Sequence, residues 1–139
     1  QLGEPGVLVH GVNTRPGKPT ILGVCDGKAV IGLPGNPVSA LVNGYVFVVP
    51  LVRRLLGQSV DVVRPSVSAK LTVNIPSQAG REDWISIKLK ETAEKSFLAE
   101  PIFGKSNLIF TLVGADGLLK IAPDATGLSA GEMVDVILI

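Results

Sequence analysis

Short apolar runs separated by turn residues predict three strands near the start of the chain. The runs Val7–Val12, Ile21–Cys25 and Lys28–Leu33 have the length of strands. Asp26-Gly27, between the last two runs, is typical of a two-residue hairpin turn. The third run has consecutive apolar residues, which favours a strand covered on both faces, as in an α/β sheet.

A helix is predicted to follow, from Pro37 to about Leu56. Asn36 is a suitable N-cap residue, and Pro37 occupies the first helical position, where a missing N–H costs nothing. Gly57 is placed to end the helix in the left-handed conformation. Pro50 is expected to kink the helix, because it removes one hydrogen bond and clashes with the carbonyl four residues earlier.

From about residue 62 the pattern changes to the alternation of apolar and polar residues that is typical of strands. About six strands are predicted, separated by turns rich in glycine, proline, asparagine and aspartate. Their spacing favours a small barrel or a bent antiparallel sheet. A linker is expected near Gln58–Pro65. The predicted strands are Val67–Ile75, Trp84–Leu89, Phe97–Ile102, Leu108–Val113, Leu118–Ala122 and Met133–Ile139.

Composition limits the function classes. Hydrophobic residues make up 46% of the 139 residues, enough for a buried core, and the formal net charge is only +1. So small a net charge creates no long-range field for nucleic acid or an anionic membrane, so any anion site must be local. The single cysteine excludes an intrachain disulfide. Because the chain begins with Gln1, we expect it to be part of a longer protein. The apolar stretch Val38–Leu56 is predicted not to span a bilayer, because it is interrupted by Asn43, Gly44, Pro50, Arg53 and Arg54.

Two loops are candidates for binding an anion. Leu33–Ala40 contains a turn followed by a helix start, where free backbone N–H groups and the helix dipole attract anions; the alternative is a well-capped strand–helix junction. Arg15–Pro19 carries two cations on a stiff loop; the alternative is a solvated basic loop. Both loops follow strands of one predicted sheet, and ligands of open α/β sheets bind at the carboxyl ends of the strands.

The second half offers weaker candidates. Arg81 precedes a predicted strand, and its planar guanidinium suits a tetrahedral oxyanion; the alternative is an ordinary hairpin in which Arg81 pairs with Glu82 or Asp83. Gly104–Asn107 is a polar loop. The sequence has no metal-ligand cluster, no Ser/His/Asp set and no acid/base pair. Three further residues are interpreted as structural: His10, Cys25 and Trp84.

Three segments together resemble the MoeA/gephyrin family of molybdopterin molybdenumtransferases. They are His10–Val12, Arg15–Thr20 and Gly32–Ala40, of which the run Leu33–Ala40 is very specific. The second half is also similar to the C-terminal β domain of that family, in the segments Gly80-Arg81, Gly104–Ser106, Ala115–Leu118 and Gly131-Glu132.

The resemblance implies an α/β plus all-β fold. Residues 1–60 would form the C-terminal part of a molybdopterin-binding, MogA-like α/β domain, and residues 61–139 a small β-barrel or β-clip domain, the fourth of the family. The implied enzyme is cytoplasmic and homodimeric, and inserts molybdate into adenylylated molybdopterin with release of AMP. It would use Mg²⁺, with ligands outside this chain, and no nucleic acid or membrane. This chain alone is expected to be inactive.

The resemblance also assigns nine residues to the binding of molybdate or the pterin phosphate. Three positions depart from the family: Arg15 replaces a frequent lysine, Ser86 a common basic residue and Phe110 a frequent serine. The alternatives are a gephyrin-type protein-anchoring scaffold and a generic phosphate-binding module. The nine assigned residues are Arg15, Lys18, Pro34, Gly35, Asn36, Pro37, Ser39, Arg81 and Ser106.

Overall fold

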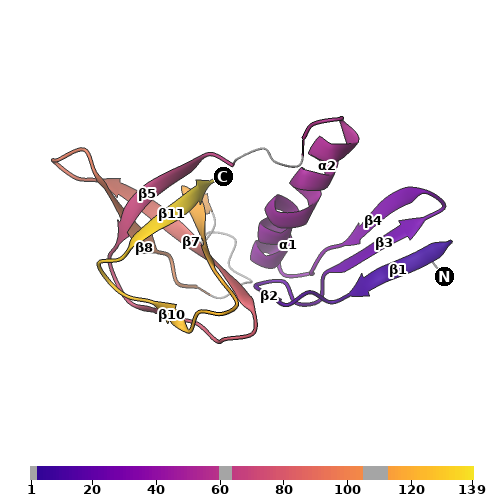
Figure 1. The fold of residues 1–139 in the computed structure, drawn as a ribbon, viewed down its shortest axis with the longest axis horizontal. Coiled ribbons are helices and arrows are strands. Elements are labelled where there is room, and N and C mark those ends of the chain that lie inside the picture. The colour runs from indigo at the N-terminus through magenta and orange to yellow at the C-terminus, as the bar shows by residue number, and fades with distance from the viewer. Residues whose placement is uncertain (1–2, 60–63, 105–112) are drawn as a thin grey trace.

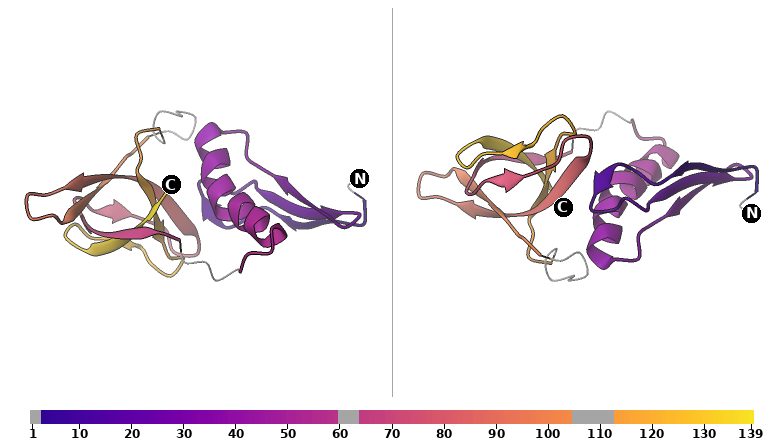
Figure 2. Two further views of the ribbon diagram at one scale, coloured as in Figure 1. Left: turned by 90° about the horizontal axis from the view of Figure 1, so that it is seen from above. Right: turned by 90° about the horizontal axis from the view of Figure 1, so that it is seen from below.

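The computed structural model of the protein describes residues 3–59, 64–104 and 113–139. The fold is mostly β, with a closed, barrel-like sheet at one end and a separate three-stranded sheet at the other (Figure 1). Figure 2 shows from two further sides that the helix lies between these two sheets. We call residues 3–59 the N-terminal region and residues 66–138 the barrel.

The sheet of the N-terminal region contains β1 (Pro5–His10), β3 (Ile21–Cys25) and β4 (Lys28–Gly32), in the order β1-β3-β4. Asp26 and Gly27 have φ values of 49° and 79°, which confirms the two-residue turn. All pairings are antiparallel, and β4 is exposed or half-buried along its length. The described residues therefore do not cover β4 on both faces, and its apolar run belongs to a hairpin in this chain.

The predicted helix runs from Pro37 to Leu55 and ends as expected. Gly57 has φ 78°. The amide of Gly57 donates to the carbonyl of Arg54, and that of Gln58 to the carbonyl of Arg53, each at 3.0 Å. These two bonds form the Schellman motif that closes many helices at a left-handed glycine.

The disturbance predicted at Pro50 takes the form of a π-helical segment. The helix is divided into α1 (Pro37–Asn43), the π-helical segment η1 (Gly44–Val48) and α2 (Val49–Leu55). Pro50 lies in the first turn of α2, where its missing N–H is tolerated. The wider π turn precedes the proline, as is common where the regular ladder is interrupted.

The helix from Pro37 to Leu55 is long and apolar enough to meet the length and composition of a membrane span. The expectation that this stretch does not span a bilayer stays a prediction, because the test considers length and composition only. A core helix of a soluble protein meets the same test. In this structure Val38 and Val42 are buried against the barrel, whereas Leu41, Val52 and Leu55 are exposed.

The barrel closes because β7 pairs with both β8 and β9, while β5 and β11 complete the circuit. The alternating pattern over Val67–Ile75 is not one strand: β5 ends at Leu71, Val73 is exposed, and Ile75 begins a short strand that pairs with β10. The strand predicted at Leu108–Val113 falls almost wholly outside the described residues. The strands are β5 (Ser66–Leu71), β6 (Ile75–Pro76), β7 (Glu82–Glu91), β8 (Phe97–Pro101), β9 (Gly117–Ile121), β10 (Gly127–Leu128) and β11 (Met133–Leu138).

The interior of the barrel is the main hydrophobic core. Its side chains occupy alternate positions along the strands, as a closed sheet requires. Each Å² of apolar surface that this core removes from water stabilises the fold by about 25 cal/mol. Its buried members are Ala69, Leu71, Ile75, Ile87, Ala99, Leu119, Ile121, Val134 and Val136.

A two-residue strand joins the N-terminal region to the barrel. β2 (Thr14–Arg15) pairs with β7 in parallel, with Thr14 opposite Glu82 and Arg15 opposite Asp83. The amide of Glu82 also donates to the carbonyl of Asn13 at 2.9 Å. Arg15, which was predicted as the start of a loop, is therefore the last residue of a short strand, directly before Pro16.

Trp84 provides the second connection. Its ring, which is 6% exposed, packs with Val38 and Val42 of the helix and with Leu118, so its prediction as a core residue is confirmed. The indole Nε1 donates to Glu82 Oε1 at 2.7 Å. Trp84 thereby fixes the helix against the barrel wall.

Candidate functional site

The antiparallel sheet brings the two candidate loops to one edge. His10, at the end of β1, lies opposite Ile21, at the start of β3, and Ile21 lies opposite Gly32, at the end of β4. Residues 11–20 and 33–36 therefore leave the sheet at the same end. The expectation that both loops meet at one edge is confirmed, although the sheet is antiparallel.

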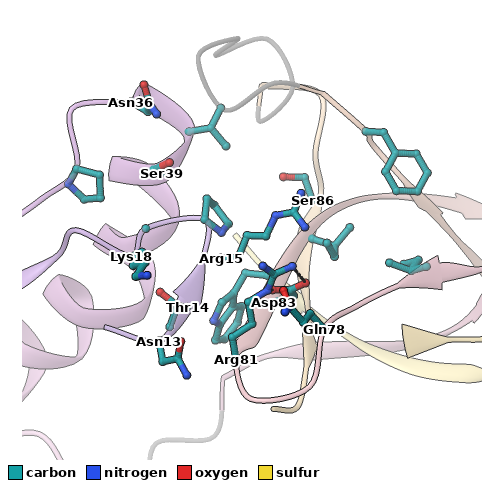
Figure 3. A pocket seen from close by; sticks show the side chains of 18 of the residues that line it. Asn13, Thr14, Arg15, Lys18, Asn36, Ser39, Gln78, Arg81, Asp83 and Ser86 are labelled. Atoms are coloured by element: carbon teal, nitrogen blue, oxygen red, sulfur yellow. Dashed lines mark hydrogen bonds and ion pairs between the residues drawn. The ribbon is translucent and has the colours of Figure 1, made fainter. Parts of the chain in front are cut away.

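A cavity of about 1070 Å³ lies between this edge, the start of the helix and the barrel. Figure 3 shows Arg15 extending toward the side formed by Arg81 and Ser86, whereas Lys18 and Asn36 lie on the side of the helix. Six of the nine predicted residues line this cavity: Arg15, Lys18, Pro34, Asn36, Ser39 and Arg81.

The other three predicted residues are not part of the described lining. Gly35 and Pro37 belong to the same turn as Asn36, but neither lines the cavity. No heavy atom lies within 4 Å of a Cβ built on Gly35, so the fold itself does not require a glycine there. Ser106 lies outside the described residues.

Buried polar contacts hold the basic loop against the helix. The amide Nδ2 of Asn43, which is 1% exposed, donates to the carbonyl of Pro16 at 3.1 Å and to that of Ser39 at 2.7 Å. The hydroxyl of Thr20 donates to the carbonyl of Gly17 at 2.8 Å. Gly17 has φ +118°, and a Cβ at this position would collide with the Asn43 amide. The loop therefore requires glycine at Gly17 both for its backbone and for its packing.

The cavity is locally positive. Arg15 and Lys18 are exposed, and within the described part of the chain neither forms an ion pair. Three cationic side chains and one carboxylate, that of Asp83, are among the described lining residues. A surplus of two positive charges thus faces one cavity in a protein whose net charge is only +1.

Of the two interpretations of Arg81, the pairing with Asp83 is confirmed, and the anion site stays a prediction. Its Nε lies 2.9 Å from Asp83 Oδ1 and its Nη2 lies 3.4 Å from Oδ2, so Arg81 forms the pair expected of an ordinary hairpin. It also lines the cavity, with its side chain 27% exposed. The ion pair and the predicted anion site are therefore compatible.

Sequence reasoning missed several polar residues of the lining. Asp83 carried a usable signal, since an aspartate within an apolar strand must find a partner if it is buried. Ser86 was considered only as a departure from the family pattern. The sequence around Asn13 does not indicate that this residue lines a cavity, because its position depends on the pairing of β2 with β7. The missed polar residues are Asn13, Thr14, Gln78, Asp83 and Ser86.

The remaining predicted structural residues lie outside the cavity lining. His10 is exposed at the end of β1, and Cys25 is half-buried rather than buried, because it lies at the last position of β3 beside the turn. Among the described residues, no group of three histidine, cysteine, aspartate or glutamate side chains is arranged to hold a metal ion.

Comparisons with known proteins give a consistent result. Residues 68–139 match the family model described as the MoeA C-terminal region, domain IV. A molybdopterin biosynthesis protein of Methanocaldococcus jannaschii is 34% identical over 140 residues, which cover 100% of this chain and 31% of that protein. Molybdopterin molybdenumtransferase 2 of Mycobacterium tuberculosis is 35% identical over 134 residues, or 96% of this chain and 32% of that protein.

A solved structure agrees with this similarity. A molybdopterin biosynthesis MoeA protein from Pyrococcus horikoshii superposes with a TM-score of 0.79 and 39% identity, over 99% of this chain and 32% of that chain. The chain therefore spans about a third of the length of the relatives that it matches.

Proposed function

Because this chain belongs to the MoeA family, we propose that it forms one side of an oxyanion site in an enzyme of molybdenum cofactor biosynthesis. The intact enzyme would insert molybdate into adenylylated molybdopterin and release AMP. The observation that carries this proposal is the cavity lined by Arg15, Lys18 and Arg81, which come from both regions of the chain.

The side chains of the cavity suit the binding of a tetrahedral dianion. Arg15 and Lys18 supply positive charge, Arg81 supplies a planar set of N–H donors, and Ser39 adds a hydroxyl beside the start of the helix. Fixed donors of this kind stabilise negative charge without having to reorganise during the reaction. Molybdate and the phosphate of the pterin are both oxyanions, so the same groups can hold either.

The described residues do not supply a site for a divalent cation. They contain no cluster of three suitable ligands, and the Asp83 carboxylate already accepts hydrogen bonds from Arg81 and Ser77. We therefore assign no step of the reaction to a metal ion bound by this chain.

Replacing Lys18 with alanine in the intact protein tests the proposal. We expect molybdate-dependent cofactor formation to fall by about 10²-fold, as for the loss of one preorganised electrostatic donor. Lys28→Ala is the matched control, because Lys28 is an exposed lysine of the same sheet and does not line the cavity. Unchanged activity of Lys18→Ala, or an equal loss in the control, would contradict the proposal.

Molybdate-dependent cofactor formation also distinguishes the proposed function from one of the alternatives, a generic phosphate-binding module. A generic phosphate-binding module would bind inorganic phosphate as tightly as molybdate, and it would support no molybdate-dependent product. We expect instead that the intact protein forms cofactor from molybdate and that phosphate acts only as a competitor.

A further inference from the structure

Asp83 is a buried charge at the wall of the cavity. It is 1% exposed, and it lines the cavity from near the start of β7. Moving a carboxylate out of water is costly unless charged or hydrogen-bonding partners compensate for it. Asp83 has both kinds: the guanidinium of Arg81, and the hydroxyl of Ser77, which donates to Oδ2 at 3.0 Å.

The backbone of Asp83 lies at a junction of three strands. It is opposite Arg15 of β2 on one side and opposite Ile121 of β9 on the other. Because neighbouring strands hold the backbone of Asp83 on both sides, the position of its carboxylate is well defined. Asp83 therefore faces Arg15 through the strand pairing and holds Arg81 through its side chain.

The ion pair determines how Arg81 can meet a ligand. A guanidinium has five N–H groups, and Arg81 directs Nε and Nη2 toward the carboxylate. Nη1 is left to donate to a ligand. The carboxylate offsets one of the three cationic charges of the lining. Arg81 therefore contributes a hydrogen-bond donor of fixed orientation, while the surplus of positive charge comes from Arg15 and Lys18.

We propose that Asp83 is the positioning residue of this anion site: it fixes the guanidinium of Arg81 and places it beside Arg15. The inference rests on the proposed function, because it takes the cavity to be an oxyanion site. It goes beyond that function by assigning a role to a residue that does not itself bind the anion.

The proposal predicts an effect opposite in sign to that of charge alone. Asp83→Asn removes a negative charge from the cavity, so an effect of charge alone would tighten the binding of an anion. If Asp83 instead positions Arg81, the substitution weakens binding, because the amide cannot accept both hydrogen bonds of the guanidinium. We expect the dissociation constant for molybdate to rise about tenfold, as for the loss of hydrogen bonds to a charged group.

A double-mutant cycle in the intact protein tests this directly, with molybdate as the probe and calorimetry as the measurement. Arg81→Ala should weaken molybdate binding by about tenfold or more. In the Arg81→Ala background, Asp83→Asn should no longer weaken binding, because the positioning role is absent there and only the effect of charge, which favours the anion, remains. Glu100→Gln is the matched control, since it removes a carboxylate from the exposed Lys90–Glu100 pair of the same barrel.

Each outcome of the cycle decides one question. If Arg81→Ala leaves molybdate binding unchanged, Arg81 is not part of an oxyanion site and the proposed function fails there. Suppose that Arg81→Ala weakens binding. The positioning role is then wrong if Asp83→Asn tightens binding in the wild-type background, or if it weakens binding equally in both backgrounds. Should Asp83→Asn fail to fold, Ser77→Ala replaces it: a two- to threefold loss that disappears in the Arg81→Ala background supports the role, and no loss overturns it.

Discussion

The two regions of this chain differ in how they are stabilised. Among the described residues, nine buried hydrophobic side chains form the core that the barrel encloses. Within the described residues of the N-terminal region, the hydrophobic residues that are buried are Val38 and Val42. Both face the barrel. The sheet of that region leaves Val7, Leu8 and Val9 exposed. The barrel thus carries its own core, whereas the described N-terminal region depends on contacts with the barrel.

This difference clarifies how the site is built. The N-terminal region supplies Arg15 and Lys18, and the barrel supplies Arg81. The pairing of β2 with β7 places Arg15 opposite Asp83, which holds Arg81. The backbone of Arg15, an exposed cation, is thereby fixed by the barrel, and such preorganisation lowers the entropic cost of binding a ligand.

The largest expected effect concerns the free energy of unfolding. Truncating a side chain should lower it much more in the barrel than in the N-terminal sheet. Ile87→Ala should lower the free energy of unfolding of the 139-residue chain by about 3 kcal/mol, because Ile87 is fully buried in the barrel core. Leu8→Ala, at a residue that is 60% exposed on β1, should lower it by only about 0.5 kcal/mol. Chemical denaturation of both variants measures the contrast, and equal losses would contradict it.

A smaller effect is expected where the basic loop contacts the helix. Gly17→Ala should destabilise the protein by about 2 kcal/mol, because the position has a positive φ and its Cβ would collide with Asn43. It should also weaken molybdate binding, since the same loop carries Arg15 and Lys18. Gly44→Ala is the control: no atom lies within 4 Å of a Cβ there, and alanine suits a helix. Thermal unfolding measures the stability of both variants, and calorimetry measures their binding of molybdate. If Gly17→Ala behaves like Gly44→Ala in both measurements, the account is contradicted.

The smallest effect concerns a surface carboxylate of the barrel. Hydrogen bonds from Lys88 and from the backbone amide of Leu89 hold the pKa of Asp116 below its ordinary value. Its stabilising contribution is therefore present above the ordinary aspartate pKa of about 3.9, and it is lost as the pH falls through the lowered pKa. Asp116→Asn should cost on the order of 0.5 kcal/mol at pH 7, because the pair is exposed. This difference should vanish in strong acid, and a difference that grew with acidity would contradict the assignment.

The elements that could be predicted from the sequence are those set by local chemistry. β3 was predicted with its observed bounds because Asp26 and Gly27 fix the hairpin, and the helix start and end follow from Pro37 and Gly57. β2 could not be predicted, because a two-residue strand has no pattern and depends on a partner 68 positions away. The break after Leu71 was missed because the alternation continues through Val73, although the chain leaves the sheet there.

The lining of the cavity was predictable to a similar extent. Arg15 and Lys18 could be selected because they lie three positions apart on a stiff loop, and Arg81 because it precedes a strand; the family resemblance then assigned all three to an anion. Asn43 was overlooked as a support of the basic loop, because it lies within a helix and contacts a segment 27 residues earlier. Residues that bind can be recognised by type, whereas residues that support them are recognised only once the chain is folded.

The most direct test of the account is to locate the anion itself. A crystal of the intact protein soaked with tungstate, an analogue of molybdate, should give an anomalous peak in the cavity. The account predicts that the peak contacts Arg81 of the barrel and at least one of Arg15 and Lys18 of the N-terminal region. A peak that contacts one region alone, or that lies outside this cavity, would contradict the claim that both regions build one oxyanion site.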